Sequence, residues 1–544
     1  LLDLSLGWFF WLFNRGFTAG TNAYTQVVGG MLRASVPVLA AFVGLLYVTY
    51  LEFNRLPAGF IPQQDKGYVL VNVQLPDSAS VERTRAAMAQ VEALARKHPA
   101  VAHTVGIAGQ SLLLGANAPN FGSMYVMLKE FADRPGHSAD DVGAELRRQC
   151  RGKVLDALVS VFGAPPIEGL GTAGGFKFIV EDRGNLGLDA LQKTSDRIVA
   201  QGAESPALRG LFNSSRAATP WLYLDIDRDK CLALDVSLAE VFSTLQVYLG
   251  SYYVNNFNEF GRSWQVNIQA DKRFRDRIEE IKLLKVRSKQ GQMAPLGTIL
   301  TVRDSSGPVM IMRYNMYSAA AISGDVAPGA SSGQAIEAMQ EIAAKELPGS
   351  MAYDWTELTY LQRQAGSTAM YVFALAVVFV FLVLAAQYES WSLPLAVILV
   401  VPMCLLCSAI GIDLAGMASN VFTQIGLVVL VGLASKNAIL IVEFAKQQQE
   451  SGVPLRQAVL EACRLRLRPI LMTSFAFILG VVPLVIAHGA GAEMRRTLGL
   501  AVFSGMLGVT VFGVFLTPVF YYSIQWFRRT APAEAKPSAP SVDA

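Results

Sequence analysis

A single lysine, Lys436, lies in the middle of an apolar stretch that is long enough to cross a membrane, residues 420–446. If Lys446 marks one end of this stretch, a rise of about 1.5 Å per helical residue places Lys436 roughly 15 Å deep, near the centre of a hydrocarbon core about 30 Å thick. A cation at that depth costs on the order of 2.5–3.5 kcal/mol on insertion scales. We therefore expect Lys436 to belong to an ion or proton pathway inside a helix bundle. The alternative is a lysine whose stem extends to the interface, but the stem is short for that depth.

Lys436 has no candidate counter-ion at its own depth in this sequence. Glu443 is seven positions further on, on the same helix face but two turns and about 10.5 Å away. Glu389 and Asp413 stand at the ends of apolar stretches. We therefore expect the carboxylates that face Lys436 to come from helices outside this sequence. Protonation of such acids would weaken their attraction to the lysine and let the helices move, which couples proton flow to mechanical work.

Two further groups of polar residues lie near the predicted pathway. Thr473 and Ser474 are one turn inside the next apolar stretch, where a hydroxyl either joins a hydrogen-bond network with the lysine or bonds to its own helix backbone. Arg464, Arg466 and Arg468 precede that stretch. They are explained most simply as interfacial anchors, and one of them could line a proton exit.

The elements that position these residues are six apolar stretches that we expect to span the membrane. They are residues 35–51, 368–387, 391–412, 420–444, 469–488 and 497–527. The composition agrees, since 52% of the residues are hydrophobic and the mean hydropathy is +0.36. A net charge of +3 is too small to indicate binding to nucleic acid.

The two ends of the chain differ from these spans. Residues 1–34 carry Trp8, Phe9, Trp11 and Phe13, which favours an amphipathic helix in the membrane interface; an eroded spanning helix is the alternative. Residues 530–544 are rich in Pro and Ala and are predicted to be disordered on the cytoplasmic side. The first residue is Leu1 and no signal peptide follows, which favours a segment of a longer polypeptide.

Residues 52–366 contain no stretch that is apolar enough to span, and they have the pattern of a large α+β domain. Residues 52–170 follow the order strand, helix, strand, strand, helix, strand, which is the split βαβ (ferredoxin-like) pattern. A second module of this kind takes residues 171–226 and 309–366. Residues 227–308 are an insertion in it, and residues 367–529 hold five spanning helices.

Within the second module and its insertion, the sequence indicates particular elements. Strands are predicted at 176–181, 222–226, 309–313, 318–323 and 351–355, with helices at 186–201 and 333–345. The insertion is expected to have a helix at 237–247 and strands at 264–269 and 284–286.

Basic residues are distributed unequally between the loops on the two sides of the predicted spans. One side holds Arg15, Arg33, Lys446, Arg456, Arg464, Arg466, Arg468, Arg528 and Arg529. The short loops of the other side hold Arg495 and Arg496. By the positive-inside rule the first set is cytoplasmic, so we expect the α+β domain in the periplasm.

The segment 107–120 of the first module, IAGQSLLLGANAPN, combines glycines with three consecutive leucines. An apolar, flexible loop at this place could act as a gate over a hydrophobic site. An ordinary packed hairpin is the alternative.

Several motifs resemble the resistance-nodulation-division (RND) multidrug exporters of the hydrophobe/amphiphile efflux type. GLASKNAILIVEFA (432–445), followed by RLRLRPILMTSFAFILGVVPLVI (464–486), is similar to the last spans of that family. LAAQYESWSLPLAVILVVP, RLPAGFIPQQDKG, LKEFADRP and LGTAGGFKF also resemble it. The resemblance covers nearly the whole chain and implies the C-terminal half of such a transporter: spans seven to twelve, two periplasmic porter modules, and a docking subdomain inserted in the second.

The resemblance implies a homotrimeric inner-membrane pump, not an enzyme, that exchanges protons for amphiphilic drugs and needs no cofactor. It would work with a periplasmic adaptor (membrane fusion) protein and an outer-membrane channel. Lys436 matches the lysine that faces an aspartate pair on span four, in the N-terminal half of the transporter. Thr473 matches a threonine of the same proton relay, and Arg466 an arginine on its cytoplasmic side. Alone, the chain is not expected to pump.

The resemblance also implies residues that contact drugs. Residues 107–120 correspond to a switch loop between two drug pockets, where family members often have phenylalanines. Gln110 and Leu112 stand there instead, which argues against a stacking preference for flat aromatic drugs. The positions expected to line the drug pockets or their entrance cleft are Val105, Ile107, Gln110, Leu112, Leu113, Leu114, Tyr125 and Phe162.

Two other functions are compatible with parts of the sequence. A heavy-metal RND pump should have methionines along its periplasmic cleft, which the scattered methionines of this sequence do not supply. The thioethers of Met310, Met312 and Met316 could bind Cu(I), but core packing is the simpler explanation. A non-transporting membrane receptor or scaffold would have no use for Lys436 in the bilayer.

Overall fold

The computed structural model describes residues 2–366 and 368–530; the tail predicted to be disordered, apart from Thr530, lies outside them. The chain forms two compact units. The first comprises Leu1–Ser215 and Met312–Ala544, and the second is Arg216–Ile311.

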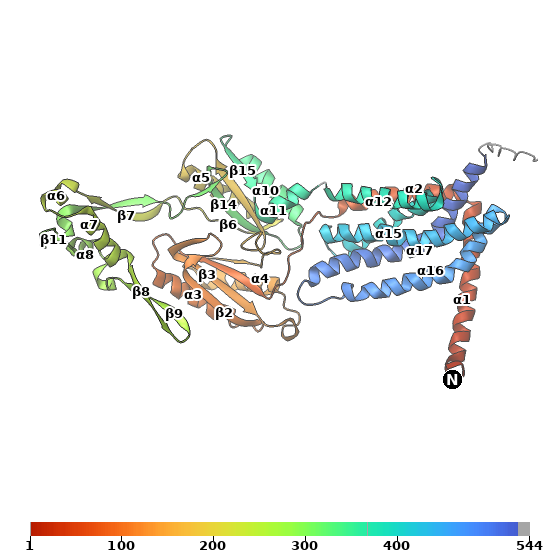
Figure 1. The fold of residues 1–544 in the computed structure, drawn as a ribbon, viewed down its shortest axis with the longest axis horizontal. Coiled ribbons are helices and arrows are strands. Elements are labelled where there is room, and N and C mark those ends of the chain that lie inside the picture. Colours follow the sequence, from red (N-terminus) through yellow and green to blue (C-terminus); the bar gives the residue numbers. More distant parts are fainter. Residues whose placement is uncertain (1, 367, 531–544) are drawn as a thin grey trace, which may run out of the picture. The chain divides into compact units, whose positions relative to one another are not determined.

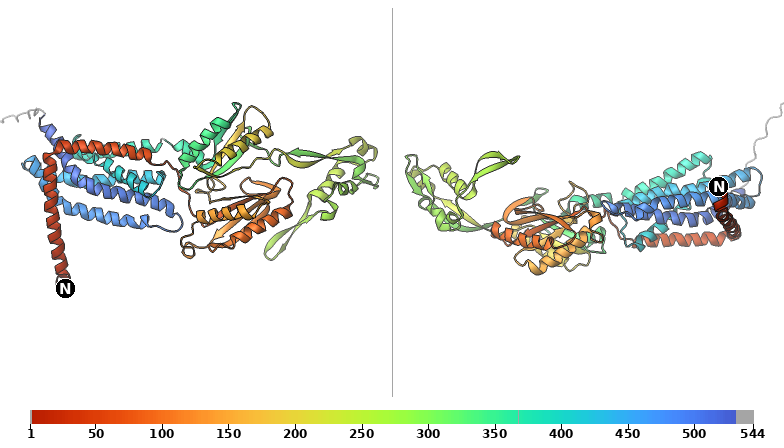
Figure 2. Two further views of the ribbon diagram at one scale, coloured as in Figure 1. Left: turned by 180° about the vertical axis from the view of Figure 1, so that it is seen from behind. Right: turned by 90° about the horizontal axis from the view of Figure 1, so that it is seen from below.

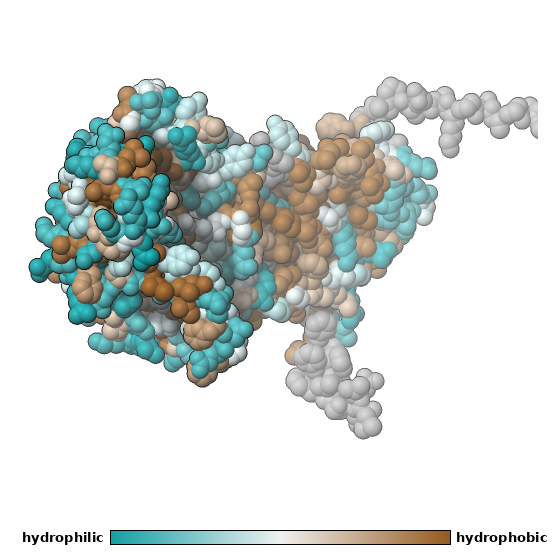
Figure 3. Space-filling view, turned by 60° about the vertical axis from the view of Figure 1, so that its left-hand side comes forward, coloured by the Kyte–Doolittle hydropathy of each residue, from teal (hydrophilic) through white to brown (hydrophobic). Residues whose placement is uncertain are grey.

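Six helical segments of the described chain are long and apolar enough to cross a membrane, which confirms the predicted number. They are α2 (Ser35–Arg55), α12 (Thr368–Tyr388), α13 (Leu393–Ile398) with α14 (Val401–Leu414), α15 (Val421–Glu450), α16 (Leu455–Val485) and α17 (Ala492–Thr530). Their apolar side chains form the hydrophobic surface of Figure 3.

The observed helices extend a few residues beyond several of the predicted spans, and two spans differ more clearly. The stretch expected as one helix at 391–412 is α13 and α14, which are separated because Pro402 stands in the first turn of α14 and cannot continue a preceding helix. Helix α16 begins at Leu455, well before the expected residue 469. Its added turns bury Leu455, Ala458, Val459 and Ala462 at helical spacing.

The helix α1 (Leu2–Arg33) runs across the other helices instead of along them (Figure 1). Its later half packs on the bundle, because Val28 and Leu32 are buried and the Tyr24 hydroxyl donates to the Val514 carbonyl at 2.9 Å. The side chains of Trp8, Phe9 and Phe13 lie outside the described residues. The interfacial position of this helix stays a prediction.

The first α+β module has the predicted βαββαβ order. Its elements are β1 (Tyr68–Gln74), α3 (Val81–Ala95), β2 (Val101–Ser111), β3 (Ala116–Leu128), α4 (Ala139–Lys153) and β4 (Leu158–Phe162). The strands form an antiparallel sheet in the order β2-β3-β1-β4. Both helices cover one face, where Val69, Val71, Met124 and Val126 are buried. Residues of the alternate positions therefore form an opposite face without helices.

The second module repeats this order. It contains β5 (Phe176–Asp182), α5 (Leu188–Gly202), β6 (Leu208–Asn213), β13 (Met312–Tyr314), β14 (Tyr317–Val326), α10 (Ser332–Glu346) and β15 (Met351–Trp355), followed by α11 (Glu357–Ala365). Strands β6, β14, β5 and β15 form the sheet, with β13 at the edge of β14. The prediction that residues 222–226 supply its second strand is wrong: β6 takes that place, and those residues pair with another strand.

The second unit has its own core, formed by residues such as Val241, Val286, Leu296 and Ile299. Its elements are β7 (Thr219–Ile226), α6 (Arg228–Ala233), α7 (Leu238–Leu245), β8 (Tyr252–Glu259), β9 (Arg262–Ile268), α8 (Ile278–Leu283), β10 (Lys285–Arg287), β11 (Met293–Pro295), α9 (Leu296–Ile299) and β12 (Leu300–Gly307). Strands β7 and β12 are paired over their full length. The unit therefore includes β7 and is longer than the predicted insertion.

The segment after α2 connects the bundle to the modules. Its Gly59 amide donates to the Ser419 carbonyl at 2.8 Å. Further on, the Asp65 carboxylate accepts two hydrogen bonds from the Arg134 guanidinium at 2.7 and 2.8 Å, together with the Ala139 amide at 2.8 Å. Both side chains of this ion pair are buried.

Candidate functional site

Lys436 lies at the middle of α15, as the sixteenth of its 30 residues. The helix begins at a capping box in which the Asn420 side chain accepts hydrogen bonds from the Phe422 and Thr423 amides at 2.9 and 3.1 Å. No proline interrupts the apolar run that follows. The midpoint position agrees with the depth inferred from the sequence.

Lys436 is exposed on the surface of the described bundle. Ile425, Val429 and Gly432 are exposed on the same helix at spacings of four and three residues, so the four residues form one stripe, here called the Lys436 stripe. An added Cβ at Gly432 would meet no atom within 4 Å. This stripe is the side of α15 that faces away from the packed helices.

No carboxylate of the described residues forms an ion pair with Lys436. The nearest candidate along the helix, Glu443, instead accepts a hydrogen bond from Gln447 Nε2 at 3.2 Å. The expectation that the counter-ion comes from outside residues 1–544 stays a prediction.

A buried hydrogen bond joins α15 to α16 beside the lysine. Asn437 Nδ2 donates to Ser474 Oγ at 3.0 Å, and both side chains are almost fully buried. The bond brings the neighbours of these residues, Lys436 and Thr473, to the same depth in the bundle. Asn437 was not among the predicted residues, although it is a second polar side chain in the same apolar stretch.

The two other predicted relay residues lie on α16 without contacting Lys436 in the described chain. Thr473 Oγ1 donates to the Ile470 carbonyl of its own helix at 3.1 Å, which is the local alternative weighed for this threonine. Arg466 is half-buried, with its guanidinium carbon 4.7 Å from the centre of the Phe444 ring. Its Nε is buried and has no hydrogen-bond partner among the described atoms.

A second group of predicted residues lies on the helix-free face of the first module's sheet. Val105 is opposite Tyr125 in the register, Tyr125 is opposite Leu70, and Leu70 is opposite Phe162. These four residues form one row across all four strands. Ile107 is opposite Ser123 in the adjacent row. Val105 is 53% exposed at one end of the first row, and Phe162 is buried at the other.

Residues 107–120 form the packed hairpin that was the alternative to a flexible gate. Strand β2 continues through Gln110 to Ser111, β3 begins at Ala116, and a four-residue turn with Leu112, Leu113 and Leu114 connects them. Ser111 Oγ donates to Asn72 Oδ1 at 2.9 Å, which fixes the turn to β1.

Leu113 connects the turn to the second module by packing against it. Its side chain is buried in a small cluster with Phe162 and with Phe212 of β6. Leu112 and Leu114 remain partly exposed beside it. Among the predicted drug contacts, the structure therefore brings Leu113 together with Phe162, and Val105 together with Tyr125.

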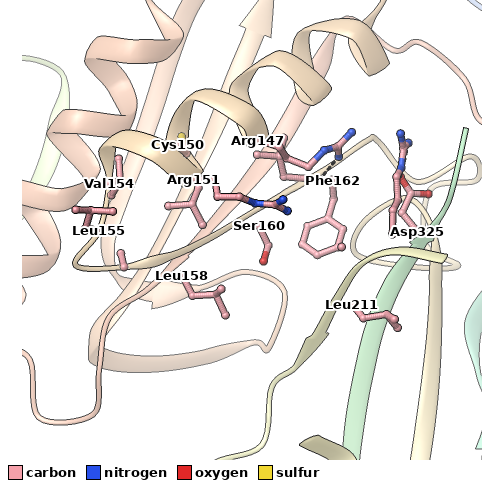
Figure 4. A pocket seen from close by; sticks show the side chains of 15 residues that line it. Arg147, Cys150, Arg151, Val154, Leu155, Leu158, Ser160, Phe162, Leu211 and Asp325 are labelled. Carbon is pink, nitrogen blue, oxygen red and sulfur yellow. Dashed lines mark hydrogen bonds and ion pairs between the residues drawn. The ribbon is translucent and has the colours of Figure 1, made fainter. Parts of the chain in front are cut away.

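A pocket of about 340 Å³ adjoins Phe162 between α4 and β4 of the first module and β6 of the second (Figure 4). The two modules contribute Phe162 and Leu211 to its wall. Its volume is in the range of sites for drug-sized molecules. Phe162 lines this cavity, and its place at an entrance cleft stays a prediction.

Two of the methionines considered for a heavy-metal site have different surroundings. Met312 packs against Ile179 and Ala319 as part of a hydrophobic cluster, and Met316 is 86% exposed.

The comparison with known families decides what kind of protein this is. A model of the AcrB/AcrD/AcrF family matches residues 3–525. This chain belongs to the AcrB/AcrD/AcrF family. Like the family as a whole, it is a multi-pass membrane protein of the bacterial inner membrane.

Individual members of the AcrB/AcrD/AcrF family show how much of a relative the chain represents. The multidrug/solvent efflux pump membrane transporter MepB of Pseudomonas putida is 38% identical over 518 residues, which are 95% of this chain and 49% of MepB. The multidrug export protein AcrF of Escherichia coli (strain K12) is 38% identical over 523 residues, 95% of this chain and 50% of AcrF. The multidrug resistance protein MdtF of that strain is 35% identical over 520 residues, which are 94% of this chain and 50% of MdtF. The chain spans about half the length of the curated relatives it matches.

Proposed function

We propose that this chain is the C-terminal half of a proton-driven exporter of amphiphilic drugs. The observation that carries the proposal is the Lys436 stripe. A charge at mid-span is costly in lipid, and this one lies on an otherwise apolar face that the described helices leave open. The stripe therefore fits a second set of helices that brings the missing carboxylates.

The proton relay would then use the residues around this stripe. Lys436 would attract ionised acids of the other half and release them when they are protonated. The Asn437–Ser474 bond would hold α15 and α16 together during that change. Thr473 is at the depth of Lys436, and the half-buried Arg466 is nearer the end of α15 that carries Lys446.

The α+β region would carry the substrate route on the periplasmic side. Both modules are proposed as porter modules, and the second unit, with a core of its own, as the docking subdomain. Val105, Ile107, Tyr125 and Phe162 would offer the drug a mostly apolar row, which attracts by roughly 25 cal/mol per Å² of buried surface. Gln110 and the three turn leucines would border it.

Contacts at one end of the helix bundle support the proposed orientation of the bundle in the membrane. Arg456 Nη2 donates to the Gly29 carbonyl at 3.4 Å, and the Arg468 guanidinium lies 5.8 Å from the Phe17 ring centre. Both contacts involve α1, so basic residues from distant positions gather there. We propose that this end is cytoplasmic.

We further propose the assembly that the family resemblance implies: a homotrimer of complete transporters, with a periplasmic adaptor and an outer-membrane channel. The names of MepB, AcrF and MdtF, as an efflux pump, an export protein and a resistance protein, support export by the complete protein.

The test of this function is a Lys436→Met variant of the complete transporter. Methionine keeps much of the length of the stem and removes the charge. We expect dye efflux to fall to the level of cells without the transporter while the protein amount in the membrane is unchanged. Val429→Ala, two turns away on the same stripe, truncates an apolar side chain and should keep most of the efflux. Full efflux by Lys436→Met would overturn the proton-coupled function and favour a receptor or another coupling route.

A further inference from the structure

The pocket beside Phe162 has an excess of positive charge. Three arginines line it, Arg147 and Arg151 from α4 and Arg209 from β6, against one acid, Asp325 of β14. The balance of charge in a cavity of this size decides which ionic ligands it can take. The question is which of these arginines remain free to bind a ligand.

Arg209 is already neutralised. Its Nη2 lies 2.7 Å from Asp325 Oδ2 and 2.7 Å from Asp140 Oδ1, and its Nε donates to Asp325 Oδ2 at 3.0 Å. Asp325 is almost completely buried by this contact. Arg209 thus uses its donors on two aspartates: Asp140 joins β6 to α4 at one end of the pocket, and Asp325 joins β6 to β14.

Arg147 is only partly satisfied. Its Nη1 donates to the Val161 carbonyl at 2.6 Å. Its Nη2 is buried without a hydrogen-bond acceptor among the described atoms, and the nearest carboxylate oxygen, Asp140 Oδ1, is 3.7 Å away. Burial and the neighbouring Arg209 lower the pKa of the Arg147 guanidinium, while Asp325 and Asp140 act against them. The side chain as a whole is partly exposed, but a buried donor nitrogen without an acceptor is costly unless an acceptor arrives.

Arg151, one helical turn after Arg147, is exposed and forms no ion pair with a described residue. Figure 4 shows both side chains extending from α4 toward the strand that carries Ser160 and Phe162. The two guanidinium groups thus lie on the same wall of the pocket. Neither has acceptors for all of its donors among the described residues.

The remaining wall is apolar. Leu155 and Leu158 are 84% and 52% exposed, and Val154 and Phe162 are buried below them. Leu211 adds an apolar side chain from the second module. Large exposed leucines beside a cavity are typical of a surface that binds an apolar partner.

We propose that this pocket binds amphiphilic anions, molecules with an apolar body and one carboxylate, sulfate or sulfonate group. The anionic group would accept hydrogen bonds from Arg147 and Arg151, and planar guanidinium groups suit such oxygens. The apolar body would lie on Leu155, Leu158 and Phe162. As a step of export, this inference rests on the proposed function, because only then is the pocket an entrance that selects substrates by charge.

The experiment compares two dyes that share one apolar body. 1-Anilinonaphthalene-8-sulfonate is N-phenyl-1-naphthylamine with an added sulfonate. Binding of each to the full chain in phosphatidylcholine nanodiscs is measured by fluorescence titration, with empty nanodiscs subtracted. We expect Arg151→Gln and Arg147→Gln each to lower the affinity for the sulfonate dye by about fivefold or more. This is the effect of losing about 1 kcal/mol from a charge-assisted hydrogen bond. The affinity for the neutral dye should change by less than about twofold.

Arg148→Gln is the matched control. Arg148 is on the same helix and exposed, but it does not line the pocket, so its loss lowers the net charge of the protein equally without touching the site. Should all three variants bind the sulfonate alike, the proposal is wrong. Equal weakening of both dyes would also overturn it, because the pocket would then select on apolar surface alone. Arg151→Gln keeps the test valid if Arg147→Gln does not fold.

This titration needs neither a proton gradient nor other parts of the transporter. A negative result would leave the Lys436 test of export untouched. Loss of proton coupling would equally leave the dye affinities unchanged.

Discussion

Two charged side chains of this chain, Asp65 and Lys436, have opposite surroundings. Asp65 is buried with Arg134 and accepts further hydrogen bonds from the Gly67 and Ala139 amides at 2.9 and 2.8 Å. Lys436 is at mid-span and has no ion pair within the described residues. A buried charge that is paired within the chain stabilises the fold. An unpaired charge at membrane depth indicates a counter-ion from another polypeptide segment.

The Asp65–Arg134 pair leads to a prediction about stability. Asp65→Asn should lower the free energy of unfolding by about 3–5 kcal/mol at neutral pH, because it leaves the buried guanidinium of Arg134 without its counter-ion. Unfolding of the chain in detergent, followed by heat or denaturant, measures the effect. Glu168→Gln is the control: Glu168 is largely exposed, its oxygen lies 3.7 Å from Lys66 Nζ, and its loss should cost less than about 1 kcal/mol.

The pH dependence of this effect follows from the Asp65 carboxyl. Burial raises its pKa, but the hydrogen bonds from Arg134, Gly67 and Ala139 outweigh burial, so the pKa is below its ordinary value. The pair therefore stabilises the fold at any pH above the ordinary value of about 3.9. That stability is lost as the pH falls through the lower folded-state pKa. A difference between wild type and Asp65→Asn that persisted unchanged at strongly acidic pH would contradict this assignment.

At this scale the sequence predicted the exceptional residue but not its surroundings. Lys436 was identifiable because one cation in an apolar stretch is costly by itself. The Asn437–Ser474 bond was not predicted, since neither residue is unusual until two helices are aligned. Thr473 could not be decided either, because its bond to Ile470 and a bond to a neighbouring helix suit the same sequence.

Among the elements, α17 is the one on which the other helices pack. Its Gly505 lies against Leu430 of α15 and its Gly508 against Cys407 of α14, so that a Cβ at either glycine would overlap its neighbour. Small residues at helix contacts let backbones approach closely in a membrane, where packing drives association. The fully buried Leu430, Val509 and Met403 fill the space around these contacts.

This packing leads to a prediction at the scale of helices. Gly508→Val should destabilise the bundle by about 1–3 kcal/mol beyond its control, because valine needs space that Cys407 occupies. The control is Gly480→Val on α16, where an added Cβ meets no atom within 4 Å. Both substitutions place valine within a helix and so share the same change in propensity. Equal melting temperatures of the two variants in detergent would refute close packing at Gly508.

The sequence predicted most of the elements, and the exceptions have physical reasons. The strands of the first module alternate regularly, so their βαββαβ order could be inferred. Strand β6 was missed because Gly210, with a positive φ of 62°, interrupts the alternation of its short sequence. The first turns of α16 were missed because Arg464 and Arg466 lower the local hydropathy, although the spacing of Leu455, Val459 and Ala462 already indicated a helix.

For the whole molecule, the helices have the properties of half of a larger bundle. Leu465, Met472 and Leu479 recur every seven residues on α16, Ile486 follows at the same spacing just after its end, and all four are more than half exposed. Such a face can meet lipid or other helices. The Lys436 stripe on α15 distinguishes the two, because lipid does not compensate a charge at mid-span. A span of about half the length of its relatives agrees with this division.

The central claim is that Lys436 is paired with acids that residues 1–544 do not contain. The most direct test is an experimental structure of the complete transporter, with one distance measured: from Lys436 Nζ to the nearest carboxylate oxygen. We predict an ion-pair distance, about 4 Å or less, to an acid on a helix from the other half, in at least one state of the transport cycle. If in every state the amine reaches water or lipid, with no acid beside it, energy coupling through Lys436 is contradicted.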